Sequence, residues 1–408
     1  MAKNRIICGL DIGTSEIKVL AAVKTDNRNL EVLGQARYPS FGLRRGTVVK
    51  PEEVSKRISE AMAQLSQELG QKIEDVYINI GGSHIFATPS SGSIVVSRAD
   101  QRISEEDKNR VIQTAQTFSL PSNKEILNIF PREFIVDDQG KIKDPLNMQG
   151  LRLEVKILAL CAFSPFLKNL TAAVLEAGFQ ISDIIPSAIA AARAVLTPQQ
   201  KELGVCLLDI GAGTTDMALY EEGDLAHLAV FPVGSELITH DIAIGLKTDI
   251  ETAEKIKKEF GSCVLKGGDK KEKIIPPQHP GNGEPLVFNH KMLVKIIEAR
   301  VSEIFSLALQ ELKRVSPKSI LPAGIVLTGG GAMLPKIVEF AKKETKLPCR
   351  IGLPEGIAGL SGDPSISAAV GLILEGSDLE MDAGGIIIPV LNSGFAEKIK
   401  KAFKFFIP

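Results

Sequence analysis

The stretch Gly204–Tyr220, GVCLLDIGAGTTDMALY, has a close counterpart near the start of the chain in Ile6–Ala22, IICGLDIGTSEIKVLAA. Each copy begins with an apolar run, reaches an aspartate (Asp209 or Asp11), turns through Ile-Gly and becomes apolar again. This order predicts a strand, a tight turn and a second strand. Two copies in one chain indicate a duplicated α/β domain. If the two domains fold face to face, both turns meet in one cleft.

The two turns carry residue types that suit a phosphate group. Glycines permit close approach of the backbone, hydroxyls add donors, and Lys18 adds a positive charge. Two aspartates brought face to face can hold a phosphate-bound Mg²⁺ through its waters, while a plain β-hairpin is the simpler alternative for either copy alone. The predicted phosphate-binding residues are Gly13, Thr14, Ser15, Lys18, Gly211, Gly213, Thr214 and Thr215, and the predicted magnesium site is formed by Asp11 and Asp209.

A third glycine cluster occurs in GIVLTGGGAML, after the apolar run Gly324–Leu327 and before a predicted helix. Gly329, Gly330 and Gly331 leave room for a flat base or a ribose. A strand, glycines and a helix in this order are a weak signal by themselves. The cluster gains weight because it follows the two phosphate-type turns in the same chain.

Composition describes an ordinary soluble protein. The chain has 408 residues, 44% apolar content, 24% charged content and a net charge of −1. It is too long for one hydrophobic core, and its charge gives no general attraction to nucleic acid. Five widely spaced cysteines without a CxxC pair indicate a reducing compartment. No apolar run approaches the roughly 20 residues that span a bilayer, so we expect a cytoplasmic protein.

Helical periodicity and capping residues predict several helices between the strand-like runs. Pro51–Leu69 places its apolar residues on one face, and Pro165–Ala177 has Ser164 as a possible cap. Ser104 is expected to cap another helix. Long helical patterns also cover roughly 291–315 and Ser365–Glu375. This alternation of strands and helices is typical of an α/β protein.

The motifs LDIGTSEIK, LDIGAGTTD and LTGGGAML resemble, in this order, the two phosphate loops and the adenosine loop of the actin-fold (ribonuclease H-like) ATPase superfamily. The resemblance implies a duplicated two-domain α/β fold with ATP and Mg²⁺ in the cleft, and adenosine at the third glycine cluster. It also makes Glu254 and Lys257, in DIETAEKIK, candidates for ribose and base contacts. A Glu–Lys pair at this spacing is also common on solvated helix surfaces.

Within this superfamily, the phrases ISDIIPSAIAAARAVLT, LTGGGAMLP and GLSGDPSISAAVGL resemble the bacterial cell-division FtsA family, and the likeness runs nearly end to end. The change of sequence pattern between Gly82 and Phe163, which interrupts the first half, also fits a small inserted subdomain of the type found in that family. The resemblance divides the chain into a first domain (1–83 and 163–200), an inserted subdomain (84–162), a second domain (201–236 and 319–376), a small subdomain (237–318), a linker (377–393) and a terminal helix (394–408).

The family resemblance implies an adaptor rather than an enzyme. Actin-fold hydrolases and kinases need an acidic residue or a glutamine to activate the attacking group, and Ser187 stands where several relatives have an acid. Asp209 and Asp216 remain possible water-orienting groups, so we expect slow ATP hydrolysis at most. Bound ATP is then expected to close the cleft and favour a shape that polymerises.

The end of the chain, FAEKIKKAFKFFIP, follows a linker-like stretch. On a helix, its phenylalanines and one isoleucine share a face, and its lysines lie opposite or beside that face. This pattern is typical of an interfacial membrane helix, although a helix docked on its own domain is the alternative. The predicted membrane contacts are Phe395, Lys398, Ile399, Lys401, Phe403, Lys404 and Phe406.

The resemblance also implies partners. They are other copies of the chain, later division proteins, and the C-terminal peptide of FtsZ, at the cytoplasmic face of the membrane and the division septum. Lys291, Lys295 and Arg300 are the candidates for contacting that peptide, although Arg300 and Glu303 can simply pair along one helix. Two rival interpretations are a PilM-like pilus-assembly protein and an actin-fold small-molecule kinase. Neither is expected to carry the Lys/Phe tail.

Overall fold

The computed structural model describes residues 6–25, 29–97, 99–265, 272–275, 286–317 and 321–382. The two similar stretches fold as equivalent β-hairpins, β1 (Ile6–Ile12) with β2 (Glu16–Lys24) and β12 (Val205–Ile210) with β13 (Thr215–Glu221). Both turns are closed by the first glycine, whose N–H donates to the carbonyl of the residue three positions on, at 3.1 Å in the first hairpin and 2.9 Å in the second. The predicted strand, turn and strand are confirmed in both copies.

Each hairpin belongs to the centre of a larger sheet. The first sheet has the strand order β11-β6-β1-β2-β3-β19, and the second has the order β14-β13-β12-β17-β18. Both mix antiparallel hairpin pairing with parallel neighbours, as β1 with β6 and β12 with β17. The further strands are β3 (Leu30–Pro39), β6 (Asp75–Ile80), β11 (Gln180–Pro186), β14 (Asp224–Phe231), β17 (Ile325–Thr328), β18 (Cys349–Ile351) and β19 (Ile357–Ala358).

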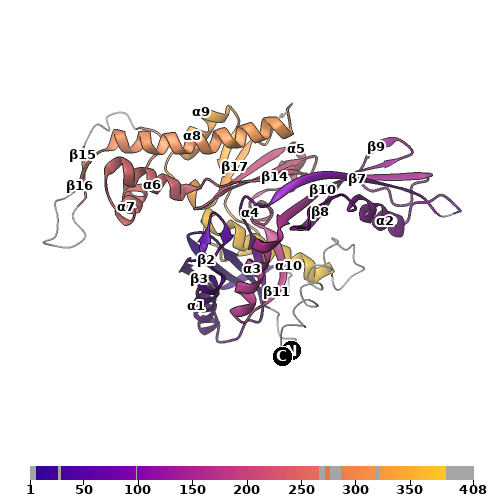
Figure 1. The fold of residues 1–408 in the computed structure, drawn as a ribbon, viewed down its shortest axis with the longest axis horizontal. Helices are drawn as coiled ribbons and strands as arrows, with labels where there is room; N and C mark the ends of the chain where they lie inside the picture. Colours follow the sequence, from indigo (N-terminus) through magenta and orange to yellow (C-terminus); the bar gives the residue numbers. More distant parts are fainter. Residues whose placement is uncertain are drawn as a thin grey trace.

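Helices cover both faces of the first sheet (Figure 1). Helix α1 (Pro51–Leu69) packs on β2, β3 and α3 (Ser164–Glu176), while α10 (Ser367–Asp382) packs on β1, β2 and β6. Helix α4 (Ser187–Val195) contacts α10 and also strands β12 and β13 of the second sheet. The pair α4 and α10 therefore lies between the two halves, and its apolar residues belong to the same core as the first sheet.

The second sheet has its own hydrophobic core beneath a long helix, α8 (His290–Val315). Helices α6 (Ser235–Leu246) and α7 (Ile250–Phe260) lie at one end of α8, beside the short hairpin of β15 (Glu272–Ile275) and β16 (Leu286–Asn289) (Figure 1). The smaller elements of the chain are β4 (Leu43–Arg44), β5 (Thr47–Val48), α5 (Pro198–Leu203), η1 (Gly330–Met333), α9 (Ile337–Thr345) and η2 (Pro364–Ile366).

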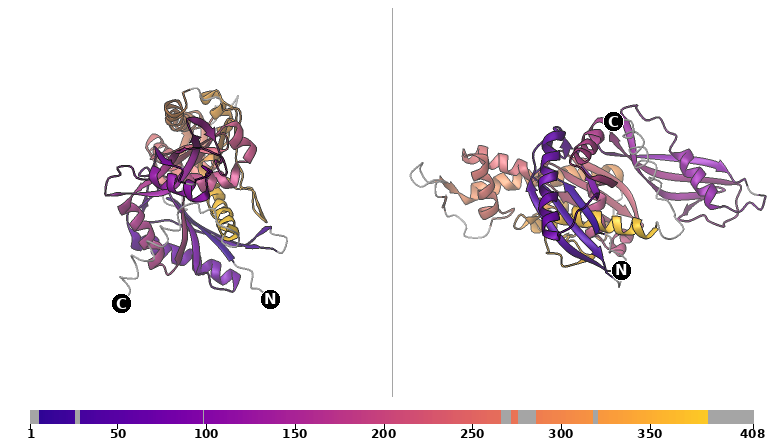
Figure 2. Two further views of the ribbon diagram at one scale, coloured as in Figure 1. Left: turned by 90° about the vertical axis from the view of Figure 1, so that its right-hand side faces the viewer. Right: turned by 90° about the horizontal axis from the view of Figure 1, so that it is seen from below.

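A separate four-stranded sheet projects from one side of the molecule, away from α6 and α7 (Figure 2). Its strand order is β7-β10-β8-β9, and one helix, α2, packs on it over a third core. Ser104 caps α2 through a reciprocal capping box with Asp107, as predicted. The further bounds are β7 (Phe86–Val95), α2 (Glu105–Ala115), β8 (Lys124–Val136), β9 (Gln139–Ile142) and β10 (Arg152–Phe163). The predicted division into subdomains stays a prediction.

Two local predictions are wrong. Ser164 does not cap α3; it is the first residue of that helix, and its buried hydroxyl has no hydrogen-bond partner among the described residues. The linker does not begin at 377, because α10 continues to Asp382. Ser377 is buried, and Asp378 accepts a 2.6 Å hydrogen bond from Arg193 of α4, which holds this part of the helix on the core.

The rest of the predicted linker and the predicted membrane helix, from 383 onward, lie outside the described residues. In the part of the chain that the structure describes, no helix combines the length and apolar character needed to cross a bilayer.

Candidate functional site

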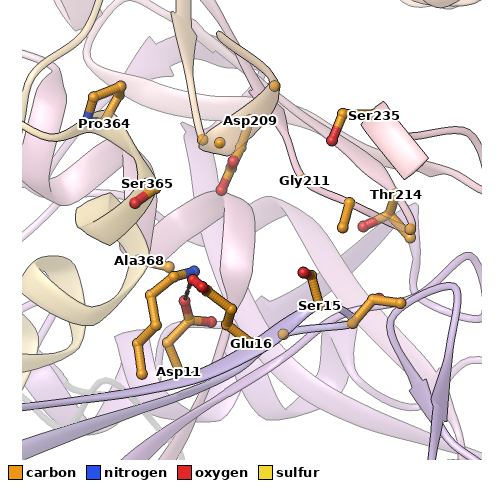
Figure 3. A pocket seen from close by; sticks show the side chains of 18 of the residues that line it. Asp11, Ser15, Glu16, Asp209, Gly211, Thr214, Ser235, Pro364, Ser365 and Ala368 are labelled. Carbon is orange, nitrogen blue, oxygen red and sulfur yellow. Dashed lines mark hydrogen bonds and ion pairs between the residues drawn. The ribbon is translucent and has the colours of Figure 1, made fainter. Parts of the chain in front are cut away.

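A cavity of about 550 Å³ lies between the two hairpins and the loop that follows β17 (Figure 3). The structure brings together at this cavity all but one of the residues predicted for nucleotide and magnesium. Those that line it are Asp11, Gly13, Thr14, Ser15, Lys18, Asp209, Gly211, Gly213, Thr214, Glu254, Lys257, Gly329, Gly330 and Gly331. Four segments that are separated in the sequence therefore meet in one cleft.

The loops approach one another so closely that two glycines are needed. A Cβ atom at Gly213 would lie 2.6 Å from Oγ1 of Thr14, so a side chain there would push the two hairpin turns apart. Gly329 has φ +83°, and its Cβ would lie 2.1 Å from Oδ1 of Asp209. The N–H of Gly46 donates to Oγ1 of Thr14 at 2.9 Å and fixes the first turn from the other side.

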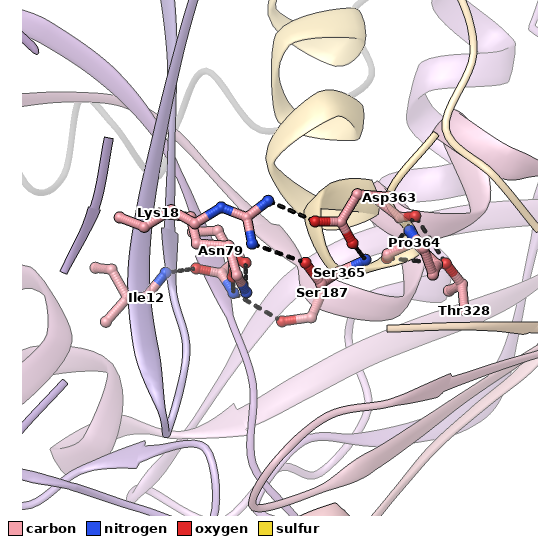
Figure 4. Close-up of polar contacts among 11 residues, drawn as sticks. Ile12, Lys18, Asn79, Ser187, Thr328, Asp363, Pro364 and Ser365 are labelled. Atoms are coloured by element: carbon pink, nitrogen blue, oxygen red, sulfur yellow. Dashed lines mark hydrogen bonds and ion pairs between the residues drawn. The ribbon is translucent and has the colours of Figure 1, made fainter. Parts of the chain in front are cut away.

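Asp11 is held by neighbours on the two adjacent strands. Lys18, its cross-strand partner on β2, has Nζ 3.4 Å from Oδ2, and Asn79 of β6 donates to Oδ1 at 2.7 Å. The Asn79 side chain also accepts from the N–H of Ile12 at 2.7 Å and donates to the hydroxyl of Ser187 at 3.1 Å (Figure 4). The sequence predictions missed Asn79, whose only signal was a polar residue inside the apolar run of β6.

The second hairpin carries a different charge at the equivalent place. Asp209 lies opposite Asp216 on β13, whereas Asp11 lies opposite Lys18 on β2. The position held by a lysine in the first hairpin is therefore held by an aspartate in the second. Burial, together with the carboxylates of Asp216 and Asp11, raises the pKa of Asp209 to about 8. Burial also raises the pKa of Asp216 to about 7. Across the cleft, Asp11 and Asp209 point toward each other (Figure 3), and this excess of buried carboxylates suits a cation.

The fit to magnesium is through water. Among the described residues, no three acidic, histidine or cysteine side chains lie close enough together to ligate one metal ion directly. Mg²⁺ commonly keeps several waters and contacts the protein through one or two carboxylates. The donor set of Asp11 and Asp209 fits that kind of site, and the predicted metal contact stays a prediction.

We expect the ionisation of Asp216 to destabilise the metal-free protein as pH rises from about 4 toward 7. An unfolded Asp titrates near about 3.9, whereas burial raises the folded pKa of Asp216 to about 7. The native state therefore binds more protons across that window, so its free energy of unfolding falls as pH rises. Asp216→Asn removes this contribution. In EDTA without nucleotide, the melting temperature of the variant relative to that of the wild type is expected to rise between about pH 5 and pH 8.

The control for this measurement is Asp138→Asn, which removes the same charge at a site where the side chain is 85% exposed. Its melting temperature is expected to follow the wild-type dependence on pH. An Asp216→Asn profile parallel to that of the wild type would contradict the assignment.

The far end of the cleft is built by α6 and α7. Lys257 is buried; its Nζ donates to Oγ1 of Thr239 at 2.7 Å and to the carbonyl of Ser235 at 3.2 Å, and it pairs with Glu254 at 2.6 Å. Burial lowers the pKa of Lys257, and the Glu254 carboxylate opposes that effect. This Glu–Lys pair is therefore not a solvated surface pair. Met333 and Leu334, which follow the glycines of the third cluster in the sequence, add apolar lining to the same cavity.

Comparison with known proteins agrees with this geometry. The sequence matches the family model described as "Cell division protein FtsA" over residues 206–371 and the model of the SHS2 domain inserted in FtsA over 82–161. A cell division protein FtsA of Pseudomonas aeruginosa is 35% identical, covering 98% of this chain and 95% of that protein. The FtsA of Bacillus subtilis is also 35% identical, over 91% and 84%. The chain belongs to the FtsA family of cell division proteins.

Solved structures show the same fold at low identity. The chain resembles MreB5 of Spiroplasma citri bound to ADP with a TM-score of 0.59 and 15% identity, covering 93% of this chain and 99% of that one. A PilM–PilN type IV pilus biogenesis complex contains a chain that matches with a TM-score of 0.64 and 16% identity, over 91% and 98%. These likenesses show the actin-like fold. The likeness to PilM extends to the fold alone, whereas the likeness to FtsA extends through the sequence.

Thr215 is the one predicted cleft residue that the structure places elsewhere. Its side chain is fully buried, and Oγ1 donates to the carbonyl of Val233 at 2.8 Å. Thr215 begins strand β13, where successive side chains point to opposite faces, and its neighbour Asp216 points into the cleft. The prediction for Thr215 is therefore wrong.

The predicted peptide-binding residues of α8 differ in their surroundings. Arg300 makes a two-pronged ion pair with Asp241 of α6, at 2.7 and 2.9 Å, and it also pairs with Glu303. Lys291 and Lys295 are exposed and make no ion pair with any other described residue. Arg300 thus has a structural role between α6 and α8, and the two lysines are the freer candidates.

Proposed function

We propose that the chain is an ATP-binding, actin-like cell-division protein that polymerises on the inner face of the cytoplasmic membrane. In this proposal it anchors FtsZ filaments there and helps to recruit later division proteins. The observation that carries the nucleotide part is the convergence of both hairpin turns and the Gly329–Gly331 loop on one cavity. Membership of the FtsA family supports the rest.

In the proposed complex, the turns of the two hairpins surround the phosphates with glycine amides and the hydroxyls of Thr14, Ser15 and Thr214. Lys18 supplies a positive charge, and Asp11 and Asp209 contact Mg²⁺ through water. The Gly329–Gly331 loop leaves room for adenosine, with Glu254 and Lys257 on its other side. The ADP named for the MreB5 structure supports a nucleotide in this fold.

ATP is proposed to act mainly as a ligand that sets the shape of the molecule. Ser187 offers no carboxylate to activate water, and its hydroxyl is already engaged, donating to the carbonyl of Ile80 at 3.2 Å. Because ligand contacts come from both halves of the chain, ATP favours the closed arrangement of the two sheets. Slow hydrolysis at most is expected from this site.

The surface of α6 and α8 supports a peptide partner at this end of the second half. Ile244 is 77% exposed and Met292 is 46% exposed, and both lie near Gly245 on neighbouring turns of the two helices. Together with Lys291 and Lys295, they offer apolar contact flanked by positive charge. We propose this surface for the C-terminal peptide of FtsZ.

The test is co-sedimentation of the full chain with anionic liposomes, with and without ATP and Mg²⁺, followed by electron microscopy of the pellets. We expect membrane-bound filaments with ATP. Deleting Phe395–Pro408 is expected to reduce the pelleted fraction to that found without liposomes, because the predicted anchor is gone. Replacing Lys398, Lys401 and Lys404 together by arginine keeps the charge and is expected to keep binding.

Two results would count against the proposal. Unchanged liposome binding after the deletion would remove the membrane anchor from it. A soluble monomer with fast, substrate-dependent ATP turnover would favour the small-molecule kinase instead.

A further inference from the structure

Arg37 links the first half of the chain to a segment that returns from the second half. Its guanidinium donates to Oδ2 of Asp363 at 2.6 Å and to Oγ of Ser365 at 3.2 Å (Figure 4). Arg37 lies on β3, whereas Asp363 and Ser365 lie at η2, more than 300 positions later in the sequence. All three residues line the same cavity as the predicted nucleotide site.

The returning segment, which runs from β18 to η2, contacts β3 near both ends of that strand. The chain leaves the second sheet at β18 and joins the first sheet at β19, which pairs with the start of β3 through Ile357 and Leu30. It then passes through an exposed turn to η2, where Arg37 binds it from near the other end of β3. Backbone pairing thus fixes one end of this segment, and the Arg37 ion pair fixes the end at the cleft.

The fixed end is joined directly to the third glycine loop. The carbonyl of Pro364 accepts hydrogen bonds from the N–H of Gly329 at 3.1 Å and from the hydroxyl of Thr328 at 3.2 Å. Asp363 uses its other oxygen to accept from the N–H of Ser365 at 2.8 Å, which shapes the η2 turn. A displacement of Asp363 is therefore expected to move Gly329 as well, because the neighbouring Pro364 carbonyl is hydrogen-bonded to the N–H of Gly329.

The place of Arg37 suits positioning better than binding of phosphate. It lies opposite Lys18 in the register of β2 and β3, so both cations point to the cleft face of the sheet. Lys18 pairs with Asp11, whereas both bonded nitrogens of Arg37 are turned to Asp363 and Ser365. Burial pushes the pKa of Asp363 upward, but the hydrogen bonds from Arg37 and Ser365, together with the charge of Arg37, outweigh it and keep the pKa below its usual value.

We propose that Arg37, Asp363 and Ser365 form a latch that holds the returning segment, and with it the Gly329 loop, against the first half and so slows the release of bound nucleotide. The latch rests on the proposed nucleotide site. It is weak enough to open, because the Arg37 and Asp363 side chains are 35% and 21% exposed and so are partly screened by water and salt.

The test is stopped-flow release of a fluorescent ATP analogue from the full chain with Mg²⁺. Arg37→Gln is expected to speed release by about fivefold and to leave the association rate within about twofold, because it frees the exit without adding or removing a phosphate contact. Arg37→Lys keeps the positive charge but loses the second hydrogen-bonding arm of the guanidinium. Its release rate is therefore expected to lie between those of the wild type and Arg37→Gln. Raising the salt concentration is expected to speed release from the wild type but not from Arg37→Gln.

Arg57→Gln is the matched control. Arg57 pairs with Glu60 at 2.6 Å with 31% and 30% exposure, a similar ion pair on α1 that does not line the cavity. We expect its release rate to stay within about twofold of the wild type. Melting temperatures without nucleotide are expected to fall equally little in Arg37→Gln and Arg57→Gln, which separates the latch from a general loss of stability.

An unchanged release rate in Arg37→Gln would overturn the latch. A loss of affinity carried by slower association would also overturn it, since that is the signature of a lost attractive charge. Failure of the wild type to bind the analogue at all would instead overturn the proposed nucleotide site.

Discussion

Gly329→Ala is expected to lower the affinity of the full chain for ATP by about 100-fold or more while leaving the protein folded. The new Cβ would lie 2.1 Å from Oδ1 of Asp209 and 2.7 Å from the carbonyl of Ile210, so the loop or the aspartate must shift by about 1 Å. In a catalytic site a displacement of that size can cost about 100-fold in rate, and we expect a loss of the same order in affinity here. The φ of +83° adds backbone strain that alanine tolerates poorly.

Isothermal titration with ATP and Mg²⁺ measures this effect, and far-UV circular dichroism checks the fold. The matched control is Gly70→Ala, at the end of α1, where φ is +65° and a Cβ would meet nothing within 4 Å. It also places an alanine at a positive φ, although in the milder left-handed helical region (ψ 17°, against 170° at Gly329), and it makes no contact with Asp209, so its affinity is expected to equal that of the wild type. Near-normal affinity in a folded Gly329→Ala variant would show that ATP binding does not depend on the close approach of the Gly329 loop to Asp209.

The hairpins were predictable because their determinants are local. An apolar run, a glycine turn and a second apolar run specify the strands, and the duplication makes convergence of the turns reasonable. Thr215 shows the limit of this reasoning: a hydroxyl next to the turn was counted with the turn, although β13 already begins there and its side chains alternate between faces. If Asp216 faces the cleft, the alternation of side chains along β13 places Thr215 on the opposite face. This reasoning would have excluded Thr215 from the predicted phosphate-binding residues.

Residues joined across long sequence distances were not predictable. Asn79 contacts Asp11 only because β6 pairs in parallel with β1, and Arg37 meets Asp363 only because β19 returns to the first sheet. No periodicity or turn motif signals either contact. The burial of Lys257 has the same cause, since spacing along α7 is identical for a solvated pair and for a pair facing a cleft.

Gly371→Ala is expected to lower the melting temperature of the empty protein by about 4 °C or more, a loss of at least about 3 kcal/mol. Glycine to alanine inside a helix normally stabilises by about 1 kcal/mol. Here the Cβ would lie 1.7 Å from the carbonyl oxygen of Ala190 and 2.3 Å from its carbonyl carbon. Both atoms are backbone of α4, so no side chain can turn away, and the two central helices must separate.

Separation of α4 and α10 is costly because these helices connect the cleft to both sheets. Ser187, at the start of α4, and Ala368, near the start of α10, both line the cavity, and α4 also contacts β12 and β13. We therefore expect Gly371→Ala to weaken ATP binding in addition to stability. Bound ATP should then recover less of the melting temperature than it does in the wild type.

Gly245→Ala on α6 provides the comparison that isolates the backbone contact. A Cβ there would come within 2.5 Å of Cδ1 of Ile296, which is the free end of a flexible side chain and can rotate away. The two substitutions add the same methyl group to a helix and differ in what it meets, so Gly245→Ala is expected to shift the melting temperature by less than about 2 °C. Equal shifts in the two variants would mean that the α4–α10 contact has room to relax, and the close packing of these helices would then not hold the two halves together.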